Sequence, residues 1–179
     1  LPLYTRSALS VRKNPKPNYS FTQKFPAFAA LDADTTFGHA AGFKAIGYAM
    51  EMAKAFGIRA VAVSNSTHPG AIASFVLKSA RDGYIAFAFT YADALLRSHG
   101  GKREYFGTNP TCFAAPRKEE EPFCLDMAPT IFSWNKLLTY REKGEKLPGE
   151  YAADENGIPT SDPDLARSIL PIGTYKGFG

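Results

Sequence analysis

The chain has 179 residues, of which 45% are hydrophobic and 21% are charged, with a formal net charge of +4 at pH 7. This composition indicates a folded chain of one-domain size with a sizeable core, and it excludes a disordered one. The lysines and arginines are scattered rather than clustered, so nucleic-acid binding is not the default expectation; a small anionic ligand suits the sign of the charge equally well.

Two cysteines, Cys112 and Cys124, each lie inside an apolar segment. We interpret them as free, buried thiols of a cytosolic protein. Their spacing does not match a zinc site, and no metal is expected. No run approaches the roughly 20 apolar residues of a membrane span, and the first residues lack the apolar core of a signal peptide. The expectation is a cytoplasmic protein without a membrane partner.

Hydrophobic periodicity predicts the elements of the first third of the chain. Residues 1–28 contain four prolines and predict extended chain and loop, followed by a short strand over Pro26–Asp32. Residues 39–56 predict a helix that ends at Gly57. The apolar stripe of this helix is formed by Phe43, Ile46, Met50 and Ala53. The many Ala and Gly residues of the helix indicate close packing against a sheet or another helix.

A polar loop, Ser64–Gly70, connects a predicted strand over 59–63 to a predicted helix over Ala71–Arg81. Pro69 suits the first turn of that helix. Such a loop brings polar side chains and unpaired helix amides to a place that a ligand can reach. It contains His68, whose imidazole can accept a hydroxyl proton near neutral pH when a secondary alcohol is oxidised by hydride transfer. From spacing alone, the alternative is a loop histidine that only hydrogen-bonds the start of the helix.

Beyond this helix the pattern alternates between short strands and turns. The predicted order is a strand over 84–90, an irregular segment over 91–106, strands over 111–115 and 122–127, a helix over 130–141 and loops from residue 145 on. The two strands around residue 118 are joined by a short charged loop, which favours an antiparallel pair. We therefore expect an α+β fold with a mixed, largely antiparallel sheet packed with helices, and no internal domain boundary is indicated.

Outside the polar loop, two charged residues are candidates for ligand binding. Asp126 ends an apolar run just before a helix, where a carboxylate either caps the helix or accepts hydrogen bonds from a ribose hydroxyl. Lys176 lies in a glycine-rich segment and either holds a phosphate or is an ordinary solvated lysine. His39 and His99 have no partner pattern, and we interpret them as structural or exposed. No G-x-G-x-x-G, Walker, H-E-x-x-H or G-x-S-x-G motif is present.

An ordered set of short motifs runs through the chain. These are L-P-x-Y at Leu1–Tyr4, H-P-G-A-I-A-S-F at His68–Phe75, G-T-N-P at Gly107–Pro110, L-D-M-A at Leu125–Ala128, D-E-N-G-I-P-T-S-D-P at Asp154–Pro163 and L-P-I-G-T-Y-K-G at Leu170–Gly177. In this order and spacing they resemble the malate/L-lactate dehydrogenases of the second type, a family that includes ureidoglycolate dehydrogenase and 2,3-diketo-L-gulonate reductase. Each motif alone is weak, while the ordered set covers essentially the whole chain.

The resemblance implies an NAD- or NADP-dependent oxidoreductase that interconverts 2-hydroxy and 2-oxo acids of the malate, lactate, ureidoglycolate or diketogulonate type. It also implies a non-Rossmann α+β cofactor domain and a homodimer. His68 matches the family's proton acceptor, and Tyr4 matches a tyrosine that lines the substrate site. Contacts with the dinucleotide are implied for Asp126, Met127, Ala128 and Lys176.

Three departures from the family pattern keep other hypotheses open. Pro129 offers no N–H to a ligand, and Ala92 stands where some members have a cofactor-contacting serine. Family members are considerably longer, so a Ser-His-Gly segment and an arginine would precede Leu1 and further helices would follow Gly179. The chain thus resembles the central, cofactor-binding part of a longer oxidoreductase. The alternative is a non-catalytic fragment or degenerate paralogue that only binds a dinucleotide or dimerises; an unrelated α+β binding domain is a third hypothesis.

Overall fold

The computed structural model describes residues 13–177, which form two compact units. Unit 1 comprises the described residues up to Ala88 together with Thr111–Asp126. Unit 2 comprises Phe89–Pro110 together with the described residues from Met127 onward. Among the described residues, no helix is both long enough and apolar enough to cross a bilayer.

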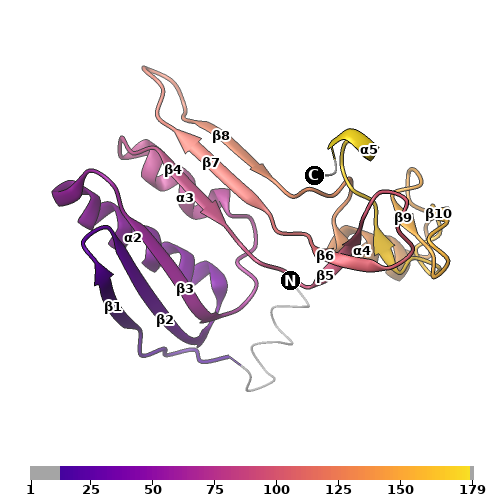
Figure 1. Ribbon diagram of the computed structural model, residues 1–179, viewed down its shortest axis with the longest axis horizontal. Helices are drawn as coiled ribbons and strands as arrows, with labels where there is room; N and C mark the ends of the chain where they lie inside the picture. The colour runs from indigo at the N-terminus through magenta and orange to yellow at the C-terminus, as the bar shows by residue number, and fades with distance from the viewer. Residues whose placement is uncertain (1–12, 178–179) are drawn as a thin grey trace. The chain divides into compact units, whose positions relative to one another are not determined.

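The first sheet of unit 1 has the strand order β1–β2–β3, and a long helix, α2, packs against it (Figure 1). The elements are β1 (Ser20–Phe25), β2 (Phe28–Thr36), α2 (Gly38–Phe56) and β3 (Ala60–Ser66). β1 and β2 are antiparallel, whereas β2 and β3 are parallel, so the carboxyl ends of β2 and β3 lie at the same edge. Alternation along β2 buries Ala29, Leu31 and Ala33.

β1 lies within the proline-rich stretch for which we predicted loop, and that prediction is wrong for these residues. Five of the six residues of β1 are exposed. An exposed polar strand of this kind shows no hydrophobic alternation, because it is held by its backbone pairing with β2 rather than by burial. The short strand predicted to follow is present as β2, which continues past its predicted end at Asp32.

Helix α2 confirms the predicted helix, but its buried face differs from the predicted stripe. Ala41 and Ala45 are buried, whereas Phe43 is 46% exposed. A Cβ on Gly42 would lie 2.6 Å from the ring of Phe75, so the absence of a side chain there lets a second helix approach. Close packing through small residues is confirmed. The predicted stripe holds in part, because Ile46 packs against the core beneath α3 and the Phe43 ring lies 6.0 Å from that of Phe75. The buried side chains of the helix are nevertheless the small ones of Ala41 and Ala45.

The second sheet of unit 1 has the order β4–β7–β8, with helix α3 against one face (Figure 1). The elements are α3 (Ala73–Arg81), β4 (Ala86–Phe89), β7 (Thr111–Ala115) and β8 (Phe123–Met127). The core beneath α3 is formed by Ile72, Phe75, Val76, Ala80, Ala86, Cys112 and Ala114. These elements confirm the predicted helix over 71–81 and the predicted strands over 84–90, 111–115 and 122–127.

The face of this sheet away from α3 carries large aromatic side chains. Phe87 is 61% exposed, and its ring centroid lies 4.8 Å from that of Phe113, which lies 5.9 Å from that of Phe123. On the α3 side, Cys112 and Cys124 are free thiols with their sulfur atoms 3.9 Å apart. Burial, followed by the contact with Cys124, raises the pKa of Cys112 to about 12, so this thiol stays protonated at neutral pH.

Unit 2 is built on a five-stranded sheet in the order β10–β9–β11–β5–β6. The elements are β5 (Ala94–Arg97), β6 (Glu104–Gly107), α4 (Trp134–Lys143), β9 (Ala152–Ala153), β10 (Pro159–Thr160), β11 (Ser168–Ile169) and α5 (Thr174–Gly177). β5 and β11 are parallel, while the other pairs are antiparallel. The α+β prediction with mixed pairing is confirmed. The prediction of an irregular segment over 91–106 is wrong, because this segment contains β5 and most of β6, whose sequences do not alternate between apolar and polar residues.

Helix α4 begins with a side-chain cap. The hydroxyl oxygen of Ser133 accepts a hydrogen bond from the Lys136 N–H at 3.2 Å. Because an amide without a partner at a helix start costs stability, Ser133→Ala should lower the free energy of unfolding by about 1 kcal/mol, measured by urea denaturation. Thr139→Ala, an exposed substitution inside the same helix, is the control and should not destabilise the chain. Equal losses in the two variants would contradict a capping role.

Candidate active site

The candidate site lies at the carboxyl ends of the parallel strands β2 and β3. Asp32 of β2 is in register with Ser64 of β3, and its Oδ2 accepts a hydrogen bond from Asn65 Nδ2 at 2.9 Å. Helix α2 leaves the end of β2, and the segment containing His68 leaves the end of β3. Ligands of open α/β sheets commonly bind outside the carboxyl ends of parallel strands. The topology thus brings the two segments together at an edge suited to a ligand.

The connection after β3 is shorter than the predicted polar loop. β3 runs through Ser66, which pairs with Thr36, so the connecting residues are 67–72 and α3 begins at Ala73. Pro69 therefore lies in the loop and not in the first helical turn, contrary to the prediction. Pairing with β2 extends the strand into residues whose polar composition favours a loop.

His68 lies in the middle of this loop, with its ring held by a neighbouring amide. Its Nδ1 accepts a hydrogen bond from the Gly70 N–H at 3.0 Å. A backbone amide can only donate, so Nδ1 carries no hydrogen and the neutral ring has its hydrogen on Nε2. The residue as a whole is exposed, but its ring is partly enclosed by neighbouring atoms. The local backbone thus selects one tautomer of the imidazole.

The surroundings of His68 favour its neutral form. Partial burial lowers the pKa of His68 below its ordinary value, and electrostatic interactions with His39 and Lys13 lower it further. The Gly70 hydrogen bond acts in the same direction, because it is made only to a ring whose Nδ1 is unprotonated. His68 is therefore neutral at pH 7, which is the form that a proton acceptor requires.

The start of α2 packs directly against the loop. The Gly38 N–H donates to Thr67 Oγ1 at 3.2 Å. A Cβ on Gly38 would overlap the Thr67 carbonyl oxygen and would lie 2.8 Å from the His68 carbonyl carbon. A Cβ on Gly70 would overlap Nε2 and Cε1 of His39. The loop is therefore fixed from the α2 side by contacts that leave no room for a side chain at either glycine.

His39, which the sequence analysis interprets as structural or exposed, also lies at this site. It is half-buried in the first turn of α2, against Gly70. The sequence contained one indication of this position. His39 and His68 each follow a strand, and if those two strands are neighbours and parallel, both histidines lie at the same edge of the sheet. The sequence pattern did not establish that the two strands pair, so this inference could not be made from it.

Asp126 holds the other end of the loop. Its Oδ2 accepts a hydrogen bond from the N–H of Ala73, the first residue of α3, at 2.8 Å. Asp126 therefore caps α3 and not the helix that follows it in the sequence. Within unit 1, His68 thus lies in the middle of this connection, and Asp126 of β8 binds the residue that follows its end.

Removal of this cap gives a stability test. Asp126→Ala should lower the free energy of unfolding by about 1 kcal/mol, because the Ala73 amide loses its acceptor at a helix start. Asp126→Asn keeps an oxygen there and should lose less. Urea denaturation of both variants, with the exposed Asp93→Ala as control, measures the effect. Unchanged stability in Asp126→Ala would show that the contact is energetically neutral.

The other implied cofactor contacts lie in unit 2. Residues 129–131 pair with residues 170–172, and the Ile172 N–H donates to the Pro129 carbonyl at 3.1 Å. Pro129 thus uses its carbonyl group in this pairing, so its missing N–H breaks no bond there. Lys176 follows on the short helix α5, where it is exposed and makes no ion pair with a described residue. Unit 2 therefore brings the segment after Ala128 next to the segment that leads to Lys176.

For the remaining predicted site residues, the structure gives a position but no contact that points to a ligand, or does not describe the residue. Tyr4 lies outside the described residues. Met127 is the last residue of β8 and is exposed, and Ala128 follows it. The Ala92 N–H donates to Asn109 Oδ1 at 3.1 Å, so the backbone at this position is held by the G-T-N-P turn. Ala92 offers no hydroxyl to a ligand.

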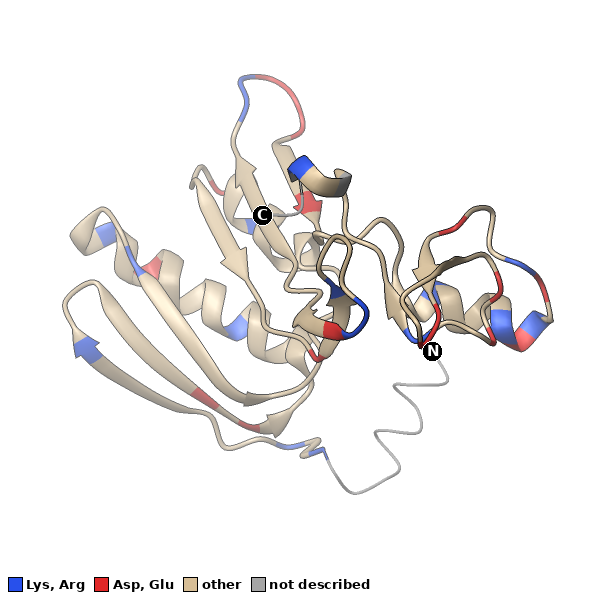
Figure 2. Ribbon diagram, turned by 45° about the vertical axis from the view of Figure 1, so that its right-hand side comes forward, with Lys and Arg blue, Asp and Glu red and all other residues tan. Residues whose placement is uncertain are grey.

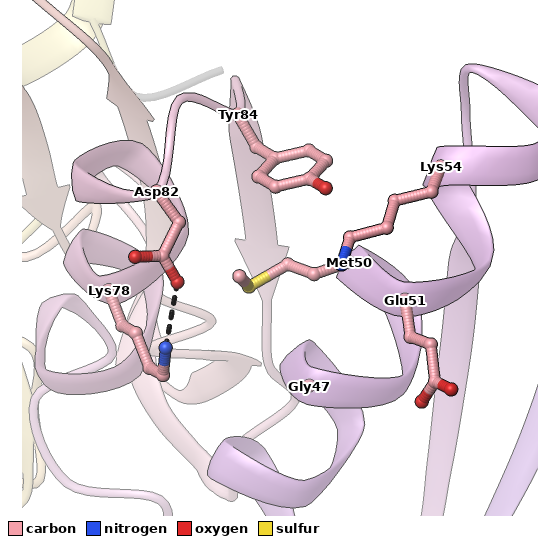
Figure 3. A pocket seen from close by; sticks show the side chains of 7 residues that line it. All are labelled: Gly47, Met50, Glu51, Lys54, Lys78, Asp82 and Tyr84. Carbon is pink, nitrogen blue, oxygen red and sulfur yellow. Dashed lines mark hydrogen bonds and ion pairs between the residues drawn. The ribbon is translucent and has the colours of Figure 1, made fainter.

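Elsewhere in residues 13–177, charged side chains form no second candidate site. Figure 2 shows Lys and Arg interspersed with Asp and Glu along the ribbon. A groove next to α2 and α3 is lined by Gly47, Met50, Glu51, Lys54, Lys78, Asp82 and Tyr84 (Figure 3). Lys78 there pairs with Asp82 at 2.7 Å, and no predicted site residue lines the groove. In the described part of the chain, no group of three or more His, Cys, Asp or Glu residues could hold a metal ion.

A family model described as malate/L-lactate dehydrogenase matches residues 1–179. The chain belongs to the malate/L-lactate dehydrogenase family. The ureidoglycolate dehydrogenase (NAD(+)) of Escherichia coli K12 is 36% identical over 166 residues, which are 93% of this chain and 48% of that protein. A (2R)-3-sulfolactate dehydrogenase (NADP(+)) of Chromohalobacter salexigens is 37% identical over 145 residues, which are 78% of this chain and 44% of that protein.

Solved structures place the fold in the same malate/L-lactate dehydrogenase family. The crystal structure of a dehydrogenase from Sinorhizobium meliloti is 30% identical, with a TM-score of 0.93 over 100% of this chain and 53% of that chain. The chain spans about half the length of these relatives, whose matched shares are 48%, 44% and 53%. The predicted family is confirmed.

Proposed function

We propose that the full-length polypeptide is a cytoplasmic, homodimeric NAD- or NADP-dependent oxidoreductase that interconverts a 2-hydroxy acid and a 2-oxo acid by hydride transfer. The observation that carries this proposal is His68, a neutral imidazole whose Nδ1 is bound by the Gly70 amide at the carboxyl ends of parallel strands. Membership in a dehydrogenase family supports it. The names of two relatives, ureidoglycolate and sulfolactate dehydrogenase, support a small hydroxy acid as substrate.

His68 is the proposed proton acceptor. In the oxidation direction Nδ1, the ring nitrogen without a hydrogen, takes the hydroxyl proton of the substrate as hydride leaves the adjacent carbon. The Gly70 N–H and the substrate hydroxyl compete for the same lone pair of Nδ1, so the Gly70 hydrogen bond must open before the proton is taken up. In the reduction direction the imidazolium returns the proton to the new alkoxide oxygen and the bond re-forms. The reaction is therefore coupled to a small change in the loop.

The residues proposed to contact the dinucleotide suit its chemistry. In unit 2, Lys176 is exposed and unpaired among the described residues, so its ammonium group is available to a phosphate. In unit 1, Asp126 uses Oδ2 for Ala73, and a carboxylate keeps further acceptor positions for a ribose hydroxyl. Met127 and Ala128 are proposed contacts by their match to the family motif, as Tyr4 is for the substrate. The bound dinucleotide would supply the hydride acceptor or donor.

Turnover by the full-length protein tests the proposal. NADH and NADPH are each offered with a panel of 2-oxo acids, and with ketones of matched size that lack the carboxylate as controls. We expect dinucleotide oxidation with 2-oxo acids only. A thermal shift with NAD and NADP separates the alternatives, because a ligand that binds the folded state raises its apparent stability. Binding without turnover would favour a non-catalytic dinucleotide-binding paralogue, and neither binding nor turnover would overturn the proposal. Light scattering tests the homodimer.

A further inference from the structure

We propose that His39 is a positioning residue for His68. Its imidazole lies against the α-carbon of Gly70 and holds residues 67–70 in the conformation in which the Gly70 amide binds His68 Nδ1. The catalytic consequence of this inference rests on the proposed function, whereas its structural part rests on the geometry of unit 1 alone.

The contact between His39 and Gly70 leaves no free space. A Cβ built on Gly70 would overlap two atoms of the His39 ring and would lie 3.2 Å from a third, Cδ2. Gly70 also has a φ of +69°, a left-handed backbone conformation that residues other than glycine rarely adopt. The ring of His39 therefore fills the volume in which any other residue at position 70 would place its side chain.

The same glycine holds His68. Its amide donates to His68 Nδ1 at 3.0 Å, so one residue contacts the ring of His39 through its α-carbon and the ring of His68 through its nitrogen. At the other end of residues 67–70, the Gly38 amide donates to Thr67 Oγ1 at 3.2 Å, which fixes the beginning of the loop. His39 follows Gly38 directly, so both loop contacts come from the first residues of α2. Loss of the His39 ring would release the end of the loop that carries the amide.

Charge acts in the same direction as packing. Among the described residues, His39 and Lys13 interact electrostatically with His68, and both interactions lower the pKa of His68 in addition to the effect of burial. Removing His39 takes away one of these interactions, so the pKa of His68 should rise toward its ordinary value. A group with a lowered pKa stays neutral to more acidic pH. Loss of His39 should therefore move the acidic limb of the oxidation rate to higher pH.

A double-mutant cycle tests the packing without any activity measurement. Gly70→Ala destabilises the chain in two ways. The unfavourable positive φ of alanine is present in any background, whereas the overlap of the new Cβ with the His39 ring exists only while His39 is present. The loss of urea midpoint caused by Gly70→Ala should therefore be smaller in the His39→Ala background than in the wild type. If the changes in urea midpoint caused by the two substitutions simply add in the double variant, the proposed contact between His39 and Gly70 is wrong.

Titration of the His68 ring tests the consequence. The ring proton signal of His68, identified by its loss in His68→Ala, is followed by NMR against pH in the full-length protein and its variants. His39→Ala should raise the titration midpoint of His68. His39→Gln, which keeps most of the ring's volume but cannot take up a proton, should raise the midpoint less, and His99→Ala in unit 2 should leave it unchanged. An unchanged midpoint in a folded His39→Ala protein would overturn the proposal.

The kinetic arm distinguishes this inference from the proposed function. If the full-length protein oxidises hydroxy acids, the pH dependence of kcat/KM should shift in His39→Ala in the same direction as the NMR midpoint, with kcat/KM lowered on the order of tenfold to a hundredfold by the displaced base. If the protein turns over no substrate, the proposed function fails while the cycle and the titration still decide the role of His39.

Discussion

Replacing His68 by alanine should lower kcat of the full-length enzyme by about a hundredfold to ten-thousandfold, the range typical for the loss of a general acid–base group. The proposed reaction needs a group that takes the hydroxyl proton, and the neutral ring of His68, with its lowered pKa, is suited to it. Water would have to take the proton in its place. Contacts proposed for the dinucleotide come from other residues, so dinucleotide binding should be retained.

Steady-state rates and thermal shifts with NAD and NADP separate these two effects. His99→Ala removes an exposed histidine of unit 2 and should leave kcat unchanged. In the wild type, the oxidation rate should fall as the pH drops through the folded pKa of His68, and this limb should lie below the ordinary histidine range because that pKa is lowered. Wild-type turnover in His68→Ala would refute the assignment of the proton acceptor.

Gly38→Ala should lower the free energy of unfolding by about 3 kcal/mol, a large effect for a single methyl group. A Cβ there would overlap the Thr67 carbonyl oxygen and would lie 2.7 Å from Pro69 N and 2.8 Å from the His68 carbonyl carbon. All three are backbone atoms, which cannot turn aside as a flexible side chain can. Relief requires α2 to move away from the loop, and His68 would be displaced with it.

Gly47→Ala is the matched control in the same helix. Apart from the neighbouring backbone of its own helix, no described atom lies within 4 Å of a Cβ at that position, so alanine there should be neutral or stabilising by about 0.5–1 kcal/mol through its higher helix propensity. Urea denaturation measures both variants, and kinetics show whether Gly38→Ala also loses turnover. Similar stabilities for the two variants would mean that the loop yields easily and that the α2 contact does not hold His68.

Sequence patterns predicted the elements that bury a regular apolar face. α3 is an example: Ile72, Phe75 and Val76 recur at helical spacing, and the structure buries all three. β1, β5 and β6 were missed, because the exposed β1 and the sequences Ala-Leu-Leu-Arg and Glu-Tyr-Phe-Gly of β5 and β6 show no alternation of apolar and polar residues. The spacing of apolar residues thus predicts an element that buries one of its own faces. It does not predict an element that is stabilised mainly by backbone pairing with another strand.

The candidate site shows the same limit. His68 was identified through its position after a strand and through the resemblance of its motif, both of which are local. The cap that Asp126 provides for α3 joins residues 53 positions apart, and the contact of His39 with Gly70 depends on the parallel pairing of β2 and β3. Neither follows from spacing, because each requires the sheet order. For that reason Asp126 was expected to cap a different helix and His39 was given no partner.

Gly70 links two properties that proteins usually adjust separately. Its α-carbon supports one imidazole, and its amide binds the other. Repacking the first turn of α2 for greater stability would therefore also change how readily His68 takes up a proton. A thermostable variant selected at these positions should inherit an altered pH optimum, and a variant selected for a new pH optimum should inherit altered stability.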